Sequence, residues 1–290
     1  MRPRTLPLAI ASIVMGSALA AVWQPFSWSV AVFSVLTAVL LQILSNLAND
    51  YGDSQHGADH AQREGPPRAV QSGAISGKTM LTAMAIMAIL SVISGLILLW
   101  FAFGSEAQDL FLIFVLVGAM AILAAVAYTA GFRPYGYAGL GDLSVLLFFG
   151  WVGVMGTYFL HSHRFDWEIL LPATSSGLLA VAVLNVNNIR DLESDRLAGK
   201  QTIPVRIGLQ RARIYHWTLL FAAILAATLY VLLARSSLWQ FLYLLTVPLL
   251  FRNGLAVQRT AALRDLNPML KQLSMATLLF VLLFSLGQLL

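Results

Sequence analysis

Most acidic side chains of this chain fall into two short clusters. Seven of its 13 acids lie either between residues 50 and 64 or between residues 191 and 195. These seven acids are Asp50, Asp53, Asp59, Glu64, Asp191, Glu193 and Asp195. Carboxylate oxygens are the ligands that hard divalent cations prefer. The two clusters therefore predict a site that binds such cations and, through them, a strongly anionic group.

The spacing within the two clusters is the same. Asn187, Asp191 and Asp195 are four residues apart, which places them along one face of a helix. Asn49 and Asp53 repeat this spacing in the first cluster. A single acidic turn after a helix is usually a solvated loop or a helix cap. Its repetition at matched positions predicts that the two clusters act together.

Basic residues follow each cluster. Arg63 and Arg68 follow the first cluster, and Lys200 and Arg206 follow the second. Several carboxylates without counter-charges would repel one another and raise their pKa values. Mg²⁺ resolves this repulsion, because it accepts a few carboxylates and completes its shell with water and phosphate oxygens. Since basic side chains can hold the remaining phosphate charge, the pattern predicts a clamp for Mg²⁺ and a diphosphate.

Other metal sites fit the first cluster less well. Counted from Asp53, Glu64 takes the twelfth position of an EF-hand loop, but Ala58 stands at the sixth, where that loop needs glycine. His56 and His60 lie in the same loop segment, a context that argues against a zinc site. Mg²⁺ remains the expected metal.

Outside the clusters the chain is strongly apolar. Hydrophobic residues make up 59% of it, charged residues make up 11%, and the mean hydropathy is +0.78. Since a soluble domain has about 25% charged residues, we expect an all-α membrane protein with a single domain over residues 1–290. The absence of cysteine excludes disulfides and thiolate metal sites. Nine apolar runs are long enough to cross a bilayer: about 6–22, 29–49, 79–101, 108–129, 140–160, 169–189, 213–234, 237–256 and 270–290.

The distribution of positive charge follows membrane topology and does not suggest nucleic-acid binding. The net charge is +5. With nine spans and a cytoplasmic N-terminus, 16 of the 18 lysines and arginines fall in inner loops, and only Arg164 and Arg235 fall outside. This is a strong positive-inside pattern. We therefore expect a multi-pass protein of the plasma (inner) membrane whose C-terminus lies outside.

The spans must bring the two clusters to one place. Each cluster begins where an even-numbered span reaches the inner surface, so we expect the clusters to converge there. The second span also carries Gln42, Ser45 and Asn46 at helical spacing, and such a polar face must look into the bundle. Glycines three residues apart within 150–156 predict close helix packing in the fifth span.

A glycine-rich loop, residues 129–141, connects the fourth and fifth spans. It contains Arg133 and Tyr137, and Tyr128 and Asp142 border it. Its glycines and proline exclude a regular helix. Two interpretations fit the loop. It is either an aromatic belt at the membrane surface with a snorkelling Arg133, or a segment that contacts the substrate.

With these residues in view, the chain resembles the UbiA superfamily of intramembrane aromatic prenyltransferases. Members share nine helices, a helical bundle with its site at the cytoplasmic end, and two motifs of the form N-x-x-x-D-x-x-x-D. The second motif is matched in full from Asn187 onward. In the first motif Gly57 stands in place of the last acid, which follows two residues later as Asp59. This departure, and residues 133–137 (Arg-Pro-Tyr-Gly-Tyr), resemble the branch that prenylates 1,4-dihydroxy-2-naphthoate.

The resemblance implies an activity and roles for individual residues. A polyprenyl group would pass from polyprenyl diphosphate to 1,4-dihydroxy-2-naphthoate with loss of diphosphate and CO₂, giving demethylmenaquinol for menaquinone biosynthesis. The implied Mg²⁺ ligands are Asp53, Asp59, Asp191 and Asp195. The implied substrate-binding residues are Asn49, Arg63, Arg68, Tyr128, Arg133, Tyr137, Asn187, Lys200 and Arg206. The implied catalytic residues are Asp53 and Asp191. Asp142, at the inner end of the fifth span, is a further catalytic candidate that would orient or deprotonate the acceptor, or else it caps the helix beside the glycine-rich turn.

Three alternatives remain open. A secondary transporter would share the internal symmetry, but its site would lie near the bilayer midplane, whereas these clusters lie at helix ends. A CDP-alcohol phosphatidyltransferase would need glycine where Ser54 stands. Within the superfamily, the acceptor could instead be 4-hydroxybenzoate or haem.

Overall fold

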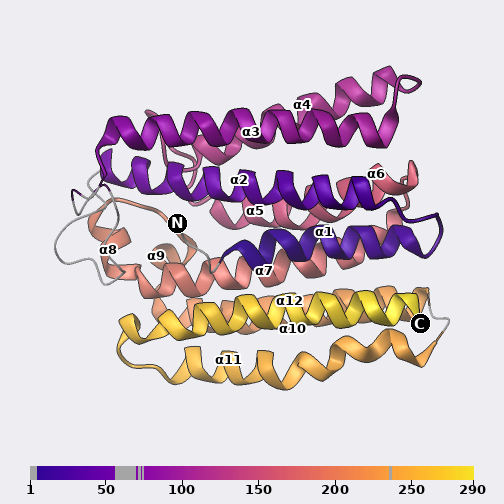
Figure 1. Cartoon of the computed structure of the whole chain (residues 1–290). Coiled ribbons are helices and arrows are strands. Elements are labelled where there is room, and N and C mark those ends of the chain that lie inside the picture. Colours follow the sequence, from indigo (N-terminus) through magenta and orange to yellow (C-terminus); the bar gives the residue numbers. More distant parts are fainter. Residues whose placement is uncertain (1–4, 56–69, 71–72, 74, 235–236) are drawn as a thin grey trace.

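In the computed structural model every described element is a helix. The structure describes residues 5–55, 70, 73, 75–234 and 237–290. The longer helices run side by side and roughly parallel in one bundle (Figure 1). The predicted all-α architecture is therefore confirmed.

The helices follow one another in the order that the apolar runs predicted. The first four are α1 (Leu6–Ala21), α2 (Trp28–Gln55), α3 (Gly77–Phe103) and α4 (Gln108–Ala127). Two composite segments come next: α5 (Gly141–Val145), the π-helix η2 (Leu146–Met155) and α6 (Gly156–Ser162), then η3 (Trp167–Ile169) and α7 (Leu170–Arg190). The remaining elements are α8 (Leu192–Leu197), α9 (Ile203–Ile207), α10 (Leu209–Leu233), η4 (Leu238–Thr246), α11 (Val247–Arg259), η5 (Leu263–Leu266) and α12 (Asn267–Leu289).

The protein is an integral multi-pass membrane protein. Among the described residues, eight helical segments are long and apolar enough to cross a membrane. The ninth predicted span is α1, whose 16 residues extend about 24 Å and fall short of the roughly 30 Å hydrocarbon layer. The C-terminus, at the end of α12, lies at the end of the bundle opposite to α8 and α9 (Figure 1).

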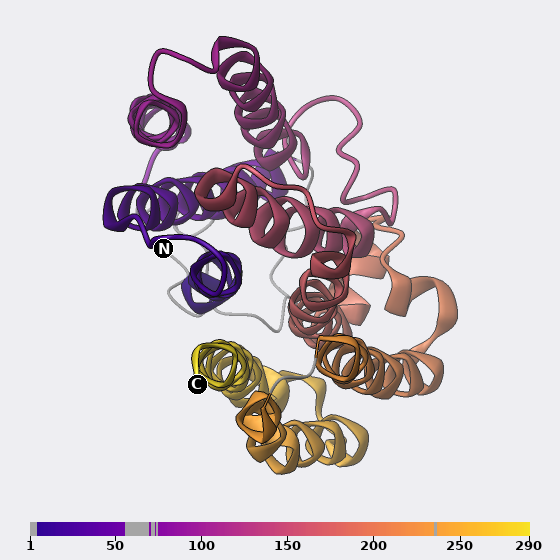
Figure 2. The same ribbon diagram turned by 90° about the vertical axis from the view of Figure 1, so that its right-hand side faces the viewer.

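The two sides of the bundle are packed differently. Helix α7 supplies much of the buried core, including Leu179 and Val186, and it packs against α10, α12 and η2. Helix α4, in contrast, has no fully buried residue. Figure 2 looks along the bundle and places α3 and α4 (purple) on one side and α11 and α12 (orange to yellow) on the other. The looser side is the one that leaves room for a site.

Small residues allow close contacts around the π-helix. A side chain at Gly150 would collide with the backbone of α7, and one at Gly153 would collide with Ser12 of α1. The Ser12 hydroxyl also donates a hydrogen bond to the Phe149 carbonyl within η2. Gly156 differs, because the space beside it is open. The predicted close packing therefore holds for two of these three glycines.

Candidate active site

One large cavity lies among α1, α2, α3, α4, η2 and α7. It has a volume of about 1120 Å³. At the end near α8 its lining includes Asp53, Asp191 and Asp195, and towards the other end it includes apolar side chains such as Leu98 and Phe114. A space with one charged end and an apolar interior suits an amphiphilic molecule with a charged head and an apolar tail.

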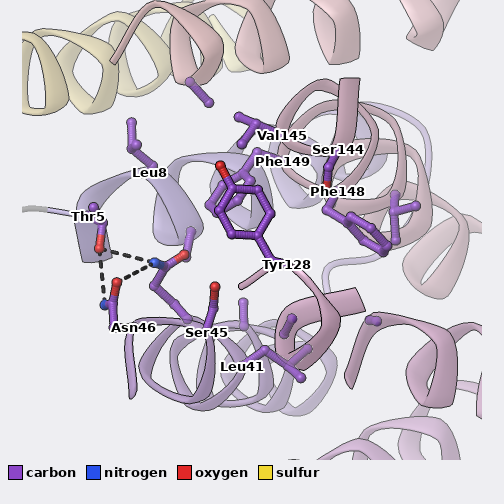
Figure 3. A pocket seen from close by; sticks show the side chains of 18 of the residues that line it. Thr5, Leu8, Leu41, Ser45, Asn46, Tyr128, Ser144, Val145, Phe148 and Phe149 are labelled. Atoms are coloured by element: carbon purple, nitrogen blue, oxygen red, sulfur yellow. Dashed lines mark hydrogen bonds between the residues drawn. The ribbon is translucent and has the colours of Figure 1, made fainter. Parts of the chain in front are cut away.

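The polar face of α2 looks into this cavity, as predicted. Gln42, Ser45, Asn46 and Asn49 all line it. Gln42 and Asn46 each donate a hydrogen bond to the hydroxyl of Thr5, the residue just before α1, over 3.0 and 3.2 Å (Figure 3). This network fixes the polar wall where α1 and α2 meet.

The glycine-rich loop is fastened to the end of α2. The Thr129 hydroxyl lies 3.0 Å from both the Ala48 carbonyl and Asn49 Oδ1. Gly52 permits this approach, because a side chain there would lie 2.3 Å from the Thr129 carbonyl oxygen. Tyr128, just before the loop, points into the cavity (Figure 3). Burial raises the pKa of Tyr128 above its ordinary value, so its phenol stays protonated.

The two ends of the loop have different surroundings. The Tyr137 hydroxyl donates a hydrogen bond to Asp53 Oδ1 over 2.7 Å, so this part of the loop belongs to the charged site. Phe132 and Arg133 are exposed, with the guanidinium carbon 5.5 Å from the ring centre. Arg133 does not line the cavity, and its implied contact with substrate finds no support in this position.

Two further implied site residues also lie outside the cavity lining. Arg206, on α9, donates a hydrogen bond to the Ala138 carbonyl over 2.7 Å and thereby holds the glycine-rich loop. Asp142, in the first turn of α5, accepts a hydrogen bond from Tyr215 of α10 over 2.8 Å. Both side chains join elements around the site, and the positions do not support the roles implied for them in substrate binding and catalysis.

Lys200 marks the point where the two acidic clusters meet. Its Nζ lies 3.0 Å from Asp53 Oδ1 and 3.3 Å from Asp195 Oδ1. The exposed fractions of these side chains are only 12%, 3% and 9%. Burial raises the pKa of Asp195 to about 6; Asp191 and Asp53 add to this effect, and Lys200 opposes it. Residues far apart in the sequence thus form one buried charged centre.

Asp191 has a partner that the sequence patterns did not reveal. Arg190 donates to both carboxylate oxygens of Asp191, over 2.8 and 2.5 Å. The same guanidinium donates to Asn187 Oδ1 over 2.9 Å and to Asn267 Oδ1 of α12 over 2.8 Å. Its side chain is 4% exposed. The sequence did contain one sign of this pair. An arginine lies within a cluster that faces the interior of the bundle, and a buried charge there needs a partner of opposite charge.

The second cluster spans a junction between two helices. Helix α7 ends at Arg190 and α8 begins at Leu192. Backbone hydrogen bonds still run from the Asp191 N–H to the Asn187 carbonyl and from the Asp195 N–H to the Asp191 carbonyl, over 3.0 and 2.8 Å. The helical hydrogen-bonding pattern that matches the four-residue spacing therefore continues through the junction.

The donor atoms at this centre suit Mg²⁺. Asp59, Arg63 and Arg68 lie outside the described residues. Within the part that the structure describes, no three His, Cys, Asp or Glu side chains form a group that could hold a metal ion. Two carboxylates from different clusters nevertheless surround one cation, the Lys200 ammonium. Hard oxygen donors around a cationic position are what Mg²⁺ requires, with water and phosphate completing the shell.

Comparison with known proteins identifies related sequences and folds. The model of the UbiA prenyltransferase family matches residues 9–281. The 1,4-dihydroxy-2-naphthoate octaprenyltransferase of Haemophilus influenzae is 48% identical over 289 residues, which cover 99% of this chain and 93% of that protein. The apo structure of a UbiA homolog from Aeropyrum pernix K1 matches with a TM-score of 0.72 at 16% identity, over 99% of this chain and 98% of that one. A UbiA homolog from Archaeoglobus fulgidus bound to DMAPP and Mg²⁺ matches with a TM-score of 0.58 at 16% identity, over 99% and 98%.

Proposed function

Because the chain belongs to the UbiA prenyltransferase family, we propose that it transfers a polyprenyl group from polyprenyl diphosphate to 1,4-dihydroxy-2-naphthoate. Diphosphate and CO₂ are released, and the product is demethylmenaquinol, an intermediate of menaquinone biosynthesis. The relative from Haemophilus influenzae, similar over nearly the whole chain, supports this acceptor. The observation that carries the proposal is the meeting of both acidic clusters at Lys200, at the charged end of an apolar cavity.

The charged end of the cavity suits the diphosphate of the donor. The proposed Mg²⁺ ligands are Asp53, Asp59, Asp191 and Asp195, with Asn49 and Asn187 beside them, and Asp59 lies outside the described residues. When bound, Mg²⁺ stabilises the negative charge that develops on the departing diphosphate. The Lys200 ammonium can bind a diphosphate oxygen directly. The Archaeoglobus fulgidus homolog bound to DMAPP and Mg²⁺ supports this assignment.

The cavity walls protect the reactive allylic group. Ionisation breaks the allylic C–O bond, and the bonding electron pair leaves with the diphosphate. The allylic cation must then be kept from water, and side chains such as Val145 and Phe148 make the wall apolar. Tyr128 and Tyr137 line the same cavity, and a ring face turned to the cation would stabilise it by about 0.5–2 kcal/mol.

The acceptor ring supplies the electrons for the new C–C bond. The ring carbon that bears the carboxylate attacks the allylic carbon. The bond to the carboxylate then breaks, CO₂ leaves, and the electron pair restores the aromatic ring. Thr5, Gln42 and Asn46 offer hydroxyl and amide groups on the wall near Tyr128 for the polar groups of the acceptor (Figure 3). Asp142 has no part in this scheme, because it does not line the cavity.

The charged end of the cavity faces the cytoplasm in this proposal. Basic residues gather at that end in α8, α9 and the connection between them, among them Arg196, Lys200 and Arg206. Cytoplasmic loops of membrane proteins carry such an excess of lysine and arginine. The site would then be reached from the aqueous side by the acceptor and from the membrane by the prenyl chain.

A product assay tests the proposed function. Membranes containing the protein receive octaprenyl diphosphate, either 1,4-dihydroxy-2-naphthoate or 4-hydroxybenzoate, and either Mg²⁺ or EDTA. Mass spectrometry is expected to detect a prenylated, decarboxylated product only with dihydroxynaphthoate and Mg²⁺. A product from 4-hydroxybenzoate alone would contradict the acceptor, and undiminished turnover in EDTA would contradict the metal.

A further inference from the structure

Lys200 occupies the position between the clusters where a divalent cation is expected. Its Nζ lies 3.0 Å from Asp53 Oδ1 and 3.3 Å from Asp195 Oδ1. A Mg²⁺ ion bound by the same two oxygens would lie about 2.0–2.1 Å from each of them. The ammonium and a metal ion therefore cannot share this position. One has to leave when the other binds.

The backbone of Lys200 is held while its side chain can move. The Lys200 N–H donates to the Asp195 carbonyl, and the Gln201 N–H donates to the Tyr137 carbonyl, both over 2.9 Å. The side chain carries a point charge on a flexible four-carbon stem. Its ammonium also lies 4.8 Å from the centre of the Tyr137 ring. Lys200 can therefore shift its charge within the site without any change in the surrounding loops.

We propose that Lys200 is an internal counter-ion that holds the cation position until the prenyl diphosphate arrives and then transfers its charge to the diphosphate. This inference rests on the proposed function, because it requires a diphosphate donor and a divalent cation. Burying carboxylates is costly, and the Lys200 ammonium between Asp53 and Asp195 offsets part of that cost in the donor-free site. The diphosphate offers Lys200 a new anionic partner, which releases Asp53 and Asp195 for the metal ion.

This exchange makes metal and diphosphate binding cooperative. Without diphosphate, Lys200 has to give up both carboxylates before a metal ion can bind, and it gains no partner in return. With diphosphate, Lys200 exchanges one set of anions for another. By linkage, diphosphate raises the affinity for the metal by the same factor as the metal raises the affinity for diphosphate. Coupling of this kind typically amounts to roughly 5- to 150-fold.

Equilibrium dialysis of the full chain in detergent measures this coupling without turnover. The probes are Mn²⁺ and inorganic pyrophosphate, each quantified in the protein-bound fraction at known free concentrations. In the wild type we expect pyrophosphate to tighten Mn²⁺ binding within the range of roughly 5- to 150-fold. In Lys200→Met we expect Mn²⁺ alone to bind at least about fivefold more tightly, pyrophosphate to bind more weakly, and the coupling to approach one. Lys271→Met removes the same charge from an exposed position on α12 and should behave like the wild type.

Other outcomes would overturn the inference. Weaker binding of Mn²⁺ alone to Lys200→Met, or wild-type coupling in that variant, would rule out the counter-ion role. If Lys200→Met does not fold, Lys200→Arg replaces it in the experiment. A guanidinium binds carboxylates more firmly than an ammonium does, so Mn²⁺ alone should bind more weakly to Lys200→Arg than to the wild type. Unchanged binding of Mn²⁺ to this variant would contradict the counter-ion role. Absence of coupling between Mn²⁺ and pyrophosphate binding in the wild-type protein would contradict the inference directly. Failure of the proposed function can be told apart from failure of this inference. In that case the product assay fails, but the coupling between Mn²⁺ and pyrophosphate binding remains.

Discussion

The two acidic clusters place similar carboxylates in different electrostatic surroundings. In the first cluster, Asp53 contacts a lysine ammonium and a tyrosine hydroxyl that come from two other segments of the chain. In the second, Asp191 is bound on both oxygens by its own neighbour, Arg190, which is also bonded to Asn187 and Asn267. One carboxylate has exchangeable partners, and the other belongs to a rigid network.

This difference assigns different duties to the side chains around Arg190 and to those around Lys200. A guanidinium bound bidentately and by two amide oxygens is pre-organised, whereas an ammonium on a long stem can change partners. The network of Arg190 therefore acts as a fixed support that joins α7 to α12. The centre of Asp53, Asp195 and Lys200 acts as the part that exchanges its cation. Changes to the support should mainly affect stability, and changes to the exchangeable part should mainly affect turnover.

The largest expected effect is on stability, from Arg190→Gln. This change leaves the Asp191 carboxylate buried without its counter-charge, which costs roughly 3–5 kcal/mol. Arg190→Lys keeps the charge and should cost less. Unfolding in detergent, followed by circular dichroism, measures the difference. If Arg190→Gln were as stable as the wild type, the Arg190 network would not contribute to the stability of the fold.

The next effect is on turnover, from Asp53→Asn. Removing one charge from the proposed metal site should lower the rate of product formation by roughly 10²- to 10³-fold, comparable with the loss of one group that stabilises transition-state charge. The melting temperature should change little, because the amide still fits the site. A rate near that of the wild type would exclude Asp53 from the clamp. Asp191→Asn is the matched comparison, and it should lower turnover and stability together.

A smaller loss of stability is expected from Asn267→Ala. Its side chain accepts a hydrogen bond from the Arg190 guanidinium, and a bond to a charged group contributes about 1.5–3 kcal/mol. The same unfolding experiment gives the value. Combining Asn267→Ala with Arg190→Gln should add little to the effect of the arginine change alone, and full additivity would show that the two residues act separately.

Tyr137→Phe should lower turnover only slightly. The change removes the hydrogen bond to Asp53 but keeps the ring, and a net loss of about 0.5–1.5 kcal/mol corresponds to between about twofold and tenfold. Tyr137→Ala should be more damaging, because the ring face is lost as well. Equal rates for the two variants would show that the ring makes no contribution.

Acid should weaken the response to Mg²⁺. Burial raises the pKa of Asp195 to about 6. Metal binds the charged carboxylate, so below pH 6 protons compete with it, and at pH 5 the apparent affinity should be about tenfold lower than at pH 8. The concentration of Mg²⁺ for half-maximal turnover at each pH tests this. Asp195→Asn should remove the dependence, and an affinity that rises as the pH falls would contradict the assignment.

Helix positions and the convergence of the clusters could be predicted from the sequence, because they depend on local pattern and on the membrane. Apolar runs place the spans, and four-residue spacing places Asn187 and Asp191 on one side of the chain. The helical pattern continues through the junction at Asp191, because the backbone hydrogen bonds are made on both sides of that residue. These features require no knowledge of distant contacts.

Partners from distant segments could not be predicted in this way. The bond from Tyr137 to Asp53 joins residues 84 positions apart, and that from Arg190 to Asn267 joins residues 77 apart. Arg133 and Tyr137 lie in the same loop, yet only Tyr137 reaches the cavity. Loop geometry is set by contacts such as that of Thr129 with α2, and composition does not specify it.

A shared cadmium site offers the most direct test of the meeting of the two clusters. The chain has no cysteine, so Asp53→Cys and Asp195→Cys, alone and combined, introduce the only thiolates. The double variant should bind one Cd²⁺ per chain through both thiolates, with strong sulfur-to-metal absorption and far tighter binding than either single variant. Two independent, weak sites in the double variant would show that the clusters do not share one cation position.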